Sequence, residues 1–359
     1  EILEAYSSQL AILLLRKAAE EEILYLSFHD KLTGLYNRRY FLDALDRLDT
    51  PRQYPISIVM GDANGLKLIN DAFGHHAGDE FLIRVAEIMK ECCRQEDILS
   101  RIGGDEFVIL LPGVSYAETH KITNRIKEMC EREHELPIKL SIALGAATKE
   151  SISQDINEVL KLAEDRMYSL KISESKRIKR EIINDLLQKL KRENPSLEKK
   201  IAYLVEWGIK FMNELDLEEQ DKIDYILLSE AHNLGDVAFL SDENREGIDS
   251  KSAPLHSEIG FRIAASSLEY AHIADFILKH HEKWDGTGYP LKLKGEEVPK
   301  IVRIFSIVNH FVDNLIDYGK DYEDNKDRII EIIKSKAGFD FDPNLTEQFI
   351  KLLVSDDQN

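Results

Sequence analysis

Apolar segments typical of buried β-strands occur only in the first 150 residues of the chain, and every later apolar repeat has a helical period. The strand-like segments lie at 56–60, 107–111 and 138–144, and helical repeats accompany them at 67–69, 81–90 and 117–132. Later helical repeats lie at 204–217, 222–231, 256–265, 270–280, 301–315 and 328–336. The pattern predicts an α/β domain followed by an all-α bundle.

The length and the connecting segments agree with two domains. The chain has 359 residues, which suits two domains of roughly 100–200 residues each. Residues 1–28 contain no Gly or Pro and predict an N-terminal signalling helix, which either pairs as a coiled coil or packs on its own domain. Residues rich in Lys, Arg and Glu predict a solvated linker helix at 178–193. The predicted domains are 29–177 and 194–359.

Charge and cysteine content narrow the classes of partner. Lys and Arg number 47 and Asp and Glu number 66, a formal net charge of −19, which argues against nucleic-acid polymers and anionic membranes. A small anionic ligand held by a metal or by local cations remains compatible with this charge. Three cysteines without a paired metal spacing favour a reduced, cytoplasmic setting. The longest early apolar run, 10–15, is too short for a membrane helix, no signal peptide is recognisable, and we expect the chain to be part of a longer protein.

A first group of carboxylates lies at the predicted ends of neighbouring strands. Asp62 follows an apolar strand, and Asp105 and Glu106 follow two glycines in a hairpin predicted between 98–102 and 107–111. Carboxylates placed in this way suit Mg²⁺, which prefers oxygen ligands. Taken alone, glycines and acidic residues also populate ordinary turns.

The sequence around these carboxylates resembles the GGDEF family of diguanylate cyclases over about residues 29–177. The segments that carry the resemblance are Asp30–Arg39, Asp62, Lys67–Asp79 and Arg101–Phe107. The resemblance implies a nucleotidyl cyclase-like palm fold and condensation of two GTP into cyclic di-GMP with release of two pyrophosphates. Since each domain of this family holds one GTP, it also implies a homodimer, with a missing upstream sensor that sets the orientation of the two domains.

The resemblance further implies roles for individual positions. A Mg²⁺ or Mn²⁺ ion would bind Asp62, Asp105 and the backbone carbonyl of Ala63. The substrate would contact Asn70 and Asp79 at the guanine edge, together with Lys67. Catalysis would use Asp105, Glu106 and the phosphate-binding Lys171, and the group that takes the proton of the ribose 3′-hydroxyl stays open between either carboxylate and water.

Two departures from the family lie in the segments that are expected to bind the phosphates of GTP. After Lys171 the chain continues with 173–177 in place of a Gly-Arg-Asn-like turn, so a phosphate-contacting arginine has no clear match. Lys176 or Arg177 could substitute in a shifted register. Gly65 and Leu66 also replace residues that are usually aromatic.

A product-binding motif precedes the glycine turn. Arg94 and Asp97 stand in the RxxD spacing, five residues before Gly103, which matches the family's inhibitory motif. Arginine can bond a guanine edge or a phosphate with two N–H groups, and aspartate can accept from guanine N–H groups. We expect feedback inhibition by cyclic di-GMP, aided by Arg125. The alternative is a surface ion pair in a charged turn.

A second group consists of four histidines on predicted helices, His232, His256, His280 and His281. Together with the segment 280–290 and the segments 255–260 and 338–343, they resemble the HD-GYP family of cyclic di-GMP phosphodiesterases over about residues 194–352. Four positions depart from that family. Asn233 replaces the aspartate of the His-Asp pair, Asp236 a lysine, Asn309 a metal-binding aspartate and Leu197 an early histidine.

These departures predict an incomplete metal centre. Asparagine keeps the shape of aspartate but removes an anionic ligand, and a bridging carboxylate is what holds two cations close together. A single Fe, Mn or Zn ion on the four histidines remains compatible with the sequence. The preferred interpretation is a cyclase with a catalytically weak or inactive regulatory module. The alternatives are a bifunctional enzyme that also hydrolyses cyclic di-GMP, and a nucleotide-responsive scaffold with two inactive halves.

Overall fold

The computed structural model describes residues 12, 14–17, 22–133, 139–240, 253–319 and 322–355. They form two compact units, and the main boundary between the units lies between Ile178 and Lys179. The helix predicted over 1–28 falls partly outside the described residues. Those that are described, 12, 14–17 and 22–28, are helical.

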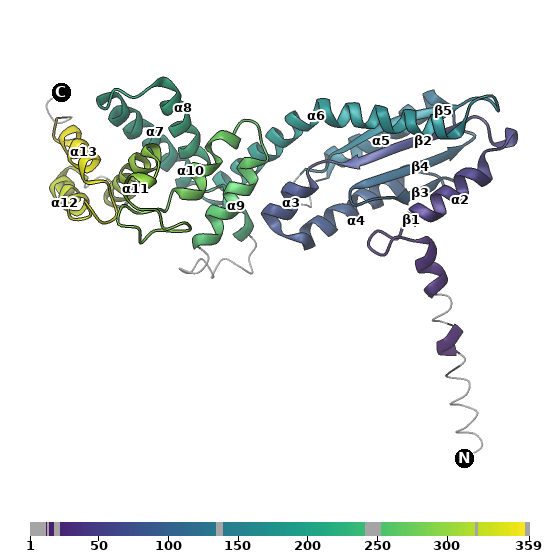
Figure 1. Ribbon diagram of the computed structural model, residues 1–359, viewed down its shortest axis with the longest axis horizontal. Coiled ribbons are helices and arrows are strands. Elements are labelled where there is room, and N and C mark those ends of the chain that lie inside the picture. The colour runs from purple at the N-terminus through teal and green to yellow at the C-terminus, as the bar shows by residue number, and fades with distance from the viewer. Residues whose placement is uncertain are drawn as a thin grey trace, which may run out of the picture. The chain divides into compact units, whose positions relative to one another are not determined.

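The N-terminal unit contains one mixed five-stranded sheet in the order β1-β3-β4-β2-β5 (Figure 1). The strands are β1 (Tyr36–Asn37), β2 (Ile56–Ala63), β3 (Ile98–Arg101), β4 (Glu106–Pro112) and β5 (Ile142–Lys149). Only the β1–β3 pair is parallel. The register places Asp62 opposite Glu106 of β4 on one side and opposite Ala143 of β5 on the other. The predicted hairpin is therefore confirmed, and β2 continues through the carboxylate that was expected to follow it.

Helices bury both faces of this sheet, which explains why every residue of β2 is buried and why its sequence is mostly apolar, with Ser57 and Asp62 as its polar residues. A shared core joins α2 (Arg38–Leu48) and the first part of α6 (Ile156–Glu193) to one face. Helix α5 (Tyr116–Arg132) packs on β2 and β5 and contacts α4 (His75–Cys92), while the short α3 (Leu66–Phe73) follows β2. A short 3-10 helix, η1, spans Pro51–Gln53.

The segment predicted as a solvated linker is the second part of α6, and the solvated character was wrong. Helix α6 is continuous from Ile156 to Glu193, and its apolar side chains from Ile178 to Leu190 include six that are buried. These are Ile178, Ile182, Ile183, Leu186, Leu187 and Leu190, at helical spacing on one face. The charged residues that suggested exposure occupy the rest of the helix surface, so α6 contributes a packed face.

The C-terminal unit is helical, as predicted, and its described residues contain no strand apart from one isolated bridge between Ala337 and Phe341. Its core contains the fully buried rings of Phe211, Tyr225, Phe305, Phe311 and Phe349. The α-helices are α7 (Ser196–Glu214), α8 (Glu219–Ala231), α9 (Ala253–Ala265), α10 (Ala274–Lys279), α11 (Lys300–Tyr318), α12 (Tyr322–Ser335) and α13 (Pro343–Ser355). Among the described residues, 3-10 helices also occur at η2 (Leu234–Phe239), η4 (Ala271–Ile273) and η5 (Gly295–Glu297).

Helix α13 was not predicted, although its start carries a clear local signal. Asp342 precedes Pro343, and its Oδ1 accepts from the backbone N–H groups of Asn344 and Leu345. This is the N-cap arrangement, with proline at the first helical position.

Across the described ranges, no helix combines the length and the hydropathy that a membrane span requires.

Candidate functional site

The first site forms where β2 ends and the antiparallel β4 begins, beside α6. The Nζ of Lys171 lies 2.5 Å from Oδ2 of Asp62 and 3.7 Å from Oδ2 of Asp105. The backbone N–H of Ala63 donates to the carbonyl of Asp105 at 2.9 Å, and Glu106 is the cross-strand neighbour of Asp62. The structure thus brings together the five residues predicted for metal binding and catalysis.

The electrostatics of this site favour a further cation. Burial raises the pKa of the Asp62 carboxyl, and the charges of Asp105 and Glu106 raise it further, although the hydrogen bond from Lys171 opposes them. Burial also disfavours the ammonium charge of Lys171, but Asp62, Asp105 and Glu106 outweigh it and raise its pKa. Three carboxylates therefore share one lysine.

One oxygen of Asp62 supplies a direct test of whether these residues fit a metal ion. Asp62 is only 3% exposed, and its Oδ1 has no hydrogen-bond partner among the described residues. A buried carboxylate oxygen without a hydrogen-bond donor costs folding free energy unless a bound ligand, such as a cation, contacts that oxygen. Carboxylate and carbonyl oxygens are the donors that Mg²⁺ and Mn²⁺ prefer, so the donor set fits the predicted ion.

Gly145 allows α6 to place Lys171 in this site. A Cβ at Gly145 would lie 2.1 Å from the backbone nitrogen of Met167, so only glycine permits this close approach of β5 and α6. Gly145 pairs with Met60, two residues before Asp62, and Met167 lies one helical turn before Lys171. This role was missed because a glycine in a predicted strand does not reveal which helix packs against it.

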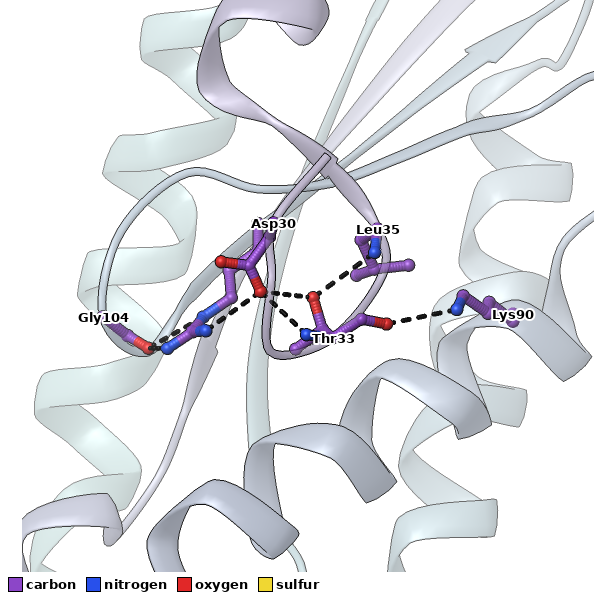
Figure 2. Close-up of polar contacts among 6 residues, drawn as sticks. Asp30, Thr33, Leu35, Lys90 and Gly104 are labelled. Carbon is purple, nitrogen blue, oxygen red and sulfur yellow. Dashed lines mark hydrogen bonds and ion pairs between the residues drawn. The ribbon is translucent and has the colours of Figure 1, made fainter. Parts of the chain in front are cut away.

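An arginine anchors the turn that carries Asp105. Arg101 donates from Nε and one terminal nitrogen to the carbonyl of Gly104, at 3.2 and 2.7 Å, and from the other terminal nitrogen to Oδ1 of Asp30 at 3.0 Å. Asp30 also accepts from the backbone N–H and the hydroxyl of Thr33, as Figure 2 shows. Asp30 and Arg101 belong to the motifs read from the sequence, but their contact spans 71 residues and had no local signal.

The residues predicted for guanine recognition lie on two consecutive helices. The side chain of Asn70 on α3 lies against the backbone of Gly78 on α4, where a Cβ would come within 1.9 Å of Oδ1. This oxygen is buried and has no hydrogen-bond partner in the described part of the chain. Asp79, next to Gly78, is exposed, as is Lys67. An unpaired acceptor beside an exposed carboxylate suits a ligand edge that carries N–H groups.

Beyond Lys171 the chain continues as a helix, whereas the family resemblance implied a turn. Lys176 and Arg177 lie on α6 and are exposed. A phosphate contact from either residue stays a prediction.

The predicted product-binding residues line a cavity of about 340 Å³. Arg94 and Asp97 border it together with His29, Tyr36 and Lys90. Asp97 is 7% exposed, burial raises the pKa of its carboxyl, and one oxygen accepts from the backbone N–H of Arg94. The other oxygen has no hydrogen-bond partner within the described ranges. The geometry suits a polar ligand better than a surface ion pair.

Arg125 does not line this cavity, although it was predicted to aid product binding. Its guanidinium donates to the backbone carbonyl of Cys92, two residues before Arg94. In this structure Arg125 therefore supports the end of α4 that leads into the cavity.

The second site brings together three of the four predicted histidines. In the described residues one group has metal-ligand spacing, and it consists of His256, His280 and His281. The Nε2 of His256 lies 3.3 Å from Nε2 of His280 and 2.9 Å from Nε2 of His281. The ring of His232 lies beside that of His280, with centroids 5.7 Å apart, and its Nδ1 faces the carbonyl of Ser229.

The Nδ1 contacts of His256 and His280 orient the Nε2 atoms of both rings toward the centre of the histidine group. Nδ1 of His256 lies 2.9 Å from Oδ1 of Asp236, and Nδ1 of His280 lies 2.6 Å from the carbonyl of Ile277. A ring that donates from Nδ1 leaves the lone pair of Nε2 free for a metal. Burial lowers the pKa of His281 to about 3 and lowers that of His280 well below its usual range, so both rings are neutral at pH 7.

Asp236 reaches His256 because η2 packs directly on α9. A Cβ at Gly235 would lie 1.8 Å from the carbonyl oxygen of His256. The residue that replaces the family's lysine therefore becomes a carboxylate partner of a candidate ligand. The three imidazoles fit one transition-metal ion such as Zn²⁺, Mn²⁺ or Fe²⁺.

The other three departures implied by the family resemblance are Asn309, Asn233 and Leu197. Asn309 borders a cavity of about 150 Å³ beside His280 and His281, and its Oδ1 lacks a hydrogen-bond partner in the part of the chain described. Asn233 precedes η2, and Leu197 is buried in α7. None of the three offers a carboxylate to the histidine group.

Glu282 is a positioning residue that the sequence reasoning missed. Its buried carboxylate accepts from the backbone N–H groups of Leu291, Lys292 and Leu293, at 2.6, 3.1 and 3.0 Å. These bonds hold the loop after His281, whose Tyr289 ring stacks on His281. The loop thus fixes one of the three imidazoles.

Comparison with known proteins agrees with the two units. Residues 27–177 match the family model described as diguanylate cyclase, GGDEF domain, and residues 177–345 match the model described as HD domain. The chain is 34% identical over 178 residues to the bifunctional diguanylate cyclase/cyclic di-GMP phosphodiesterase MucR of Pseudomonas aeruginosa, covering 47% of this chain and 25% of that protein. It is 29% identical over 167 residues to the probable diguanylate cyclase DgcT of Escherichia coli, covering 44% and 37%.

A solved structure is also similar. It contains the coiled coil and GGDEF domain of DgcB from Caulobacter crescentus in complex with c-di-GMP, at 22% identity and a TM-score of 0.42. The similarity covers 48% of this chain and 96% of that one. The matched segments make up no more than 37% of either curated relative.

Proposed function

Because the chain consists of a GGDEF domain followed by an HD-family domain, we propose that it is a diguanylate cyclase. The reaction joins two GTP into cyclic di-GMP and releases two pyrophosphates. Each ribose 3′-oxygen forms a bond to the α-phosphorus of the other nucleotide, while the bond to the leaving pyrophosphate breaks. The observation that carries the proposal is the buried Asp62, whose Oδ2 contacts Lys171 while its Oδ1 lacks a partner among the described residues.

The residues of the site divide the work by position. A bound Mg²⁺ or Mn²⁺, held by Asp62, Asp105 and the carbonyl of Ala63, would supply neutralisation of phosphate charge. Lys171 adds a second positive charge and keeps Asp62 oriented. Glu106 and Asp105 are the carboxylates available to accept the 3′-hydroxyl proton, directly or through water. Asn70 and Asp79 orient guanine, so that binding places the reacting atoms.

The reaction requires two GTP sites that face each other, and we propose a homodimer. The described apolar residues of the N-terminal helix support this proposal. Ile12, Leu15 and Ile23 are 65%, 71% and 68% exposed, which suits pairing with a second copy. An upstream sensor would act by changing the orientation of the paired domains.

The test of the proposed activity is incubation of the purified protein with GTP and Mg²⁺, followed by mass spectrometry. We expect cyclic di-GMP, with two pyrophosphates released for each molecule formed. A protein that binds GTP but makes neither product would instead be the nucleotide-responsive scaffold.

We further propose that cyclic di-GMP inhibits its own synthesis by binding in the Arg94 cavity, defined by Arg94, Asp97, His29, Tyr36 and Lys90. Its volume lies at the lower end of small-molecule pockets, which suits one guanine-bearing part of the ligand. Arg94 supplies paired N–H donors, and the unpaired oxygen of Asp97 supplies the acceptor for a guanine N–H.

For the C-terminal domain we propose a regulatory module that binds one transition-metal ion and hydrolyses cyclic di-GMP weakly or not at all. His256, His280 and His281 supply three imidazole donors, whereas Asn233 and Asn309 stand where the family resemblance implies carboxylates that would bridge two ions. Incubation with cyclic di-GMP and Mn²⁺ or Fe²⁺ tests this assignment. Formation of pGpG or GMP would favour the bifunctional alternative.

Asp236→Asn should weaken metal binding by the C-terminal domain about tenfold, because the amide no longer strengthens the basicity of His256. Titration of metal-free protein with Zn²⁺ or Co²⁺ against a competing chelator measures the affinity. Asp275→Asn, an exposed aspartate on α10 that pairs with Lys279, is the matched control. Equal affinities of wild type and Asp236→Asn would contradict the assigned role.

A further inference from the structure

A chain of hydrogen bonds connects the Arg94 cavity with the turn that carries Asp105, within the N-terminal unit. Lys90 on α4 lines the cavity, and its Nζ donates to the backbone carbonyl of Thr33 at 3.2 Å. The N–H and hydroxyl of Thr33 donate to Oδ1 of Asp30 at 2.9 and 2.7 Å. Figure 2 shows these contacts converging on the loop between Asp30 and Leu35.

The second part of the chain runs from Asp30 to the glycine turn. The same Oδ1 of Asp30 accepts from Arg101 at 3.0 Å, and Arg101 donates twice to the carbonyl of Gly104. Burial opposes ionisation of Asp30, but the bonds from Thr33 and Arg101 outweigh it and lower the pKa of its carboxyl. One ionised oxygen therefore joins the loop to the turn.

Arg101 anchors the turn at Gly104, beside backbone bonds from Ala63 to Asp105 and from Ile102 to Glu106. A Cβ built on Gly104 would meet nothing within 4 Å, so side-chain packing does not hold this residue from that side. The carbonyl group of Gly104 belongs to the peptide bond with Asp105, which is a predicted metal ligand. A change at Arg101 would therefore move or loosen a residue of the proposed catalytic site.

Lys90 is the point at which a ligand can act on this chain. Its ammonium now donates to a neutral carbonyl, and a phosphodiester in the cavity would offer an anionic acceptor, which forms a hydrogen bond about twice as strong. A bound anion would therefore draw Lys90 away from Thr33. The loop that presents Asp30 to Arg101 would lose one of its supports.

We propose that an anionic nucleotide bound in the Arg94 cavity is sensed at the catalytic turn through Lys90, Thr33, Asp30, Arg101 and Gly104. The inference rests on the proposed product inhibition and assigns it a route inside a single domain. Loss of the Lys90 contact reproduces the ligand-bound state, so Lys90→Met lowers cyclase activity in the absence of ligand.

Hydrogen exchange of residues 102–106, with and without cyclic di-GMP, tests the route. In the wild type, saturating ligand should raise exchange at the turn about fivefold, the size of one net hydrogen bond. Lys90→Met should show this increase without ligand and change little when ligand is added, while still binding it within about tenfold of the wild-type affinity. Lys161→Met, an exposed lysine on α6, should behave as wild type.

The outcomes separate this inference from the proposed activity. An unchanged exchange rate in the liganded wild type, or a full ligand response in Lys90→Met, overturns the route. Failure of the wild type to bind cyclic di-GMP overturns both the route and the product inhibition. Failure to convert GTP, with the ligand response at the turn intact, overturns the cyclase assignment and supports the route.

Discussion

Replacing Asp105 with alanine should lower the rate of cyclic di-GMP synthesis by about a thousandfold or more. The substitution removes one of the two predicted carboxylate ligands of the metal, whose stabilisation of phosphate charge is worth several kcal/mol in the transition state. It also removes one candidate acceptor for the 3′-hydroxyl proton. Pyrophosphate release and mass spectrometry of the product measure the effect.

The fold should survive this substitution, because the side chain of Asp105 is 38% exposed and lies in a turn. Thermal unfolding should therefore match that of the wild type. Asp43→Ala, an exposed aspartate on α2, serves as the matched control and should keep normal activity. Retention of a tenth of the wild-type rate by Asp105→Ala would remove Asp105 from the assigned site.

Replacing Arg94 with alanine should raise the inhibition constant of cyclic di-GMP about a hundredfold. Two charge-assisted hydrogen bonds to guanine or phosphate together contribute about 3 kcal/mol, and each 1.4 kcal/mol is a factor of ten. The loss should be large because Arg94 supplies the paired N–H donors, whereas the cavity residues Lys90 and Asp97 offer a single ammonium and an acceptor. Initial rates at several product concentrations give the constant.

Arg132→Ala controls for the loss of one positive charge, since Arg132 is 79% exposed near the end of α5 and pairs with Glu128. Its inhibition constant should equal that of the wild type. If Arg94→Ala is inhibited as strongly as wild type, the Arg94 cavity is not the product site, although the cyclase assignment would stand.

Local sequence patterns predicted most of the elements that lie near the first site. The β3–β4 hairpin, β2 and the helices α3, α4 and α5 all fall on predicted segments, because apolar periodicity and glycine turns are local properties. The last strand was displaced, predicted at 138–144 and found at Ile142–Lys149. Its second half, with Gly145, Ala146 and Ala147, has weak strand propensity, and pairing with β2 decides its register.

Other differences came from tertiary packing. The charged surface of α6 suggested exposure, but tertiary packing buries the apolar side chains from Ile178 to Leu190, which local composition cannot report. Four histidines were predicted to share one site, yet only three of them bring ligand atoms together in the described structure. Helix packing orients each ring, and sequence spacing does not determine that orientation.

The sequence by itself determined the two domain classes and the acidic and histidine groups, and it predicted that Asn233 and Asn309 stand in place of carboxylates. Motif residues and periodic apolar positions are local features of the sequence, so they can be recognised without a structure. Only the tertiary structure decided that Lys171 contacts Asp62 across 109 residues and that Asp236 faces His256. It also joined Lys90 to the catalytic turn. These contacts arise from close backbone approaches at Gly145 and Gly235 and from long side chains that span separate elements, which no local pattern records.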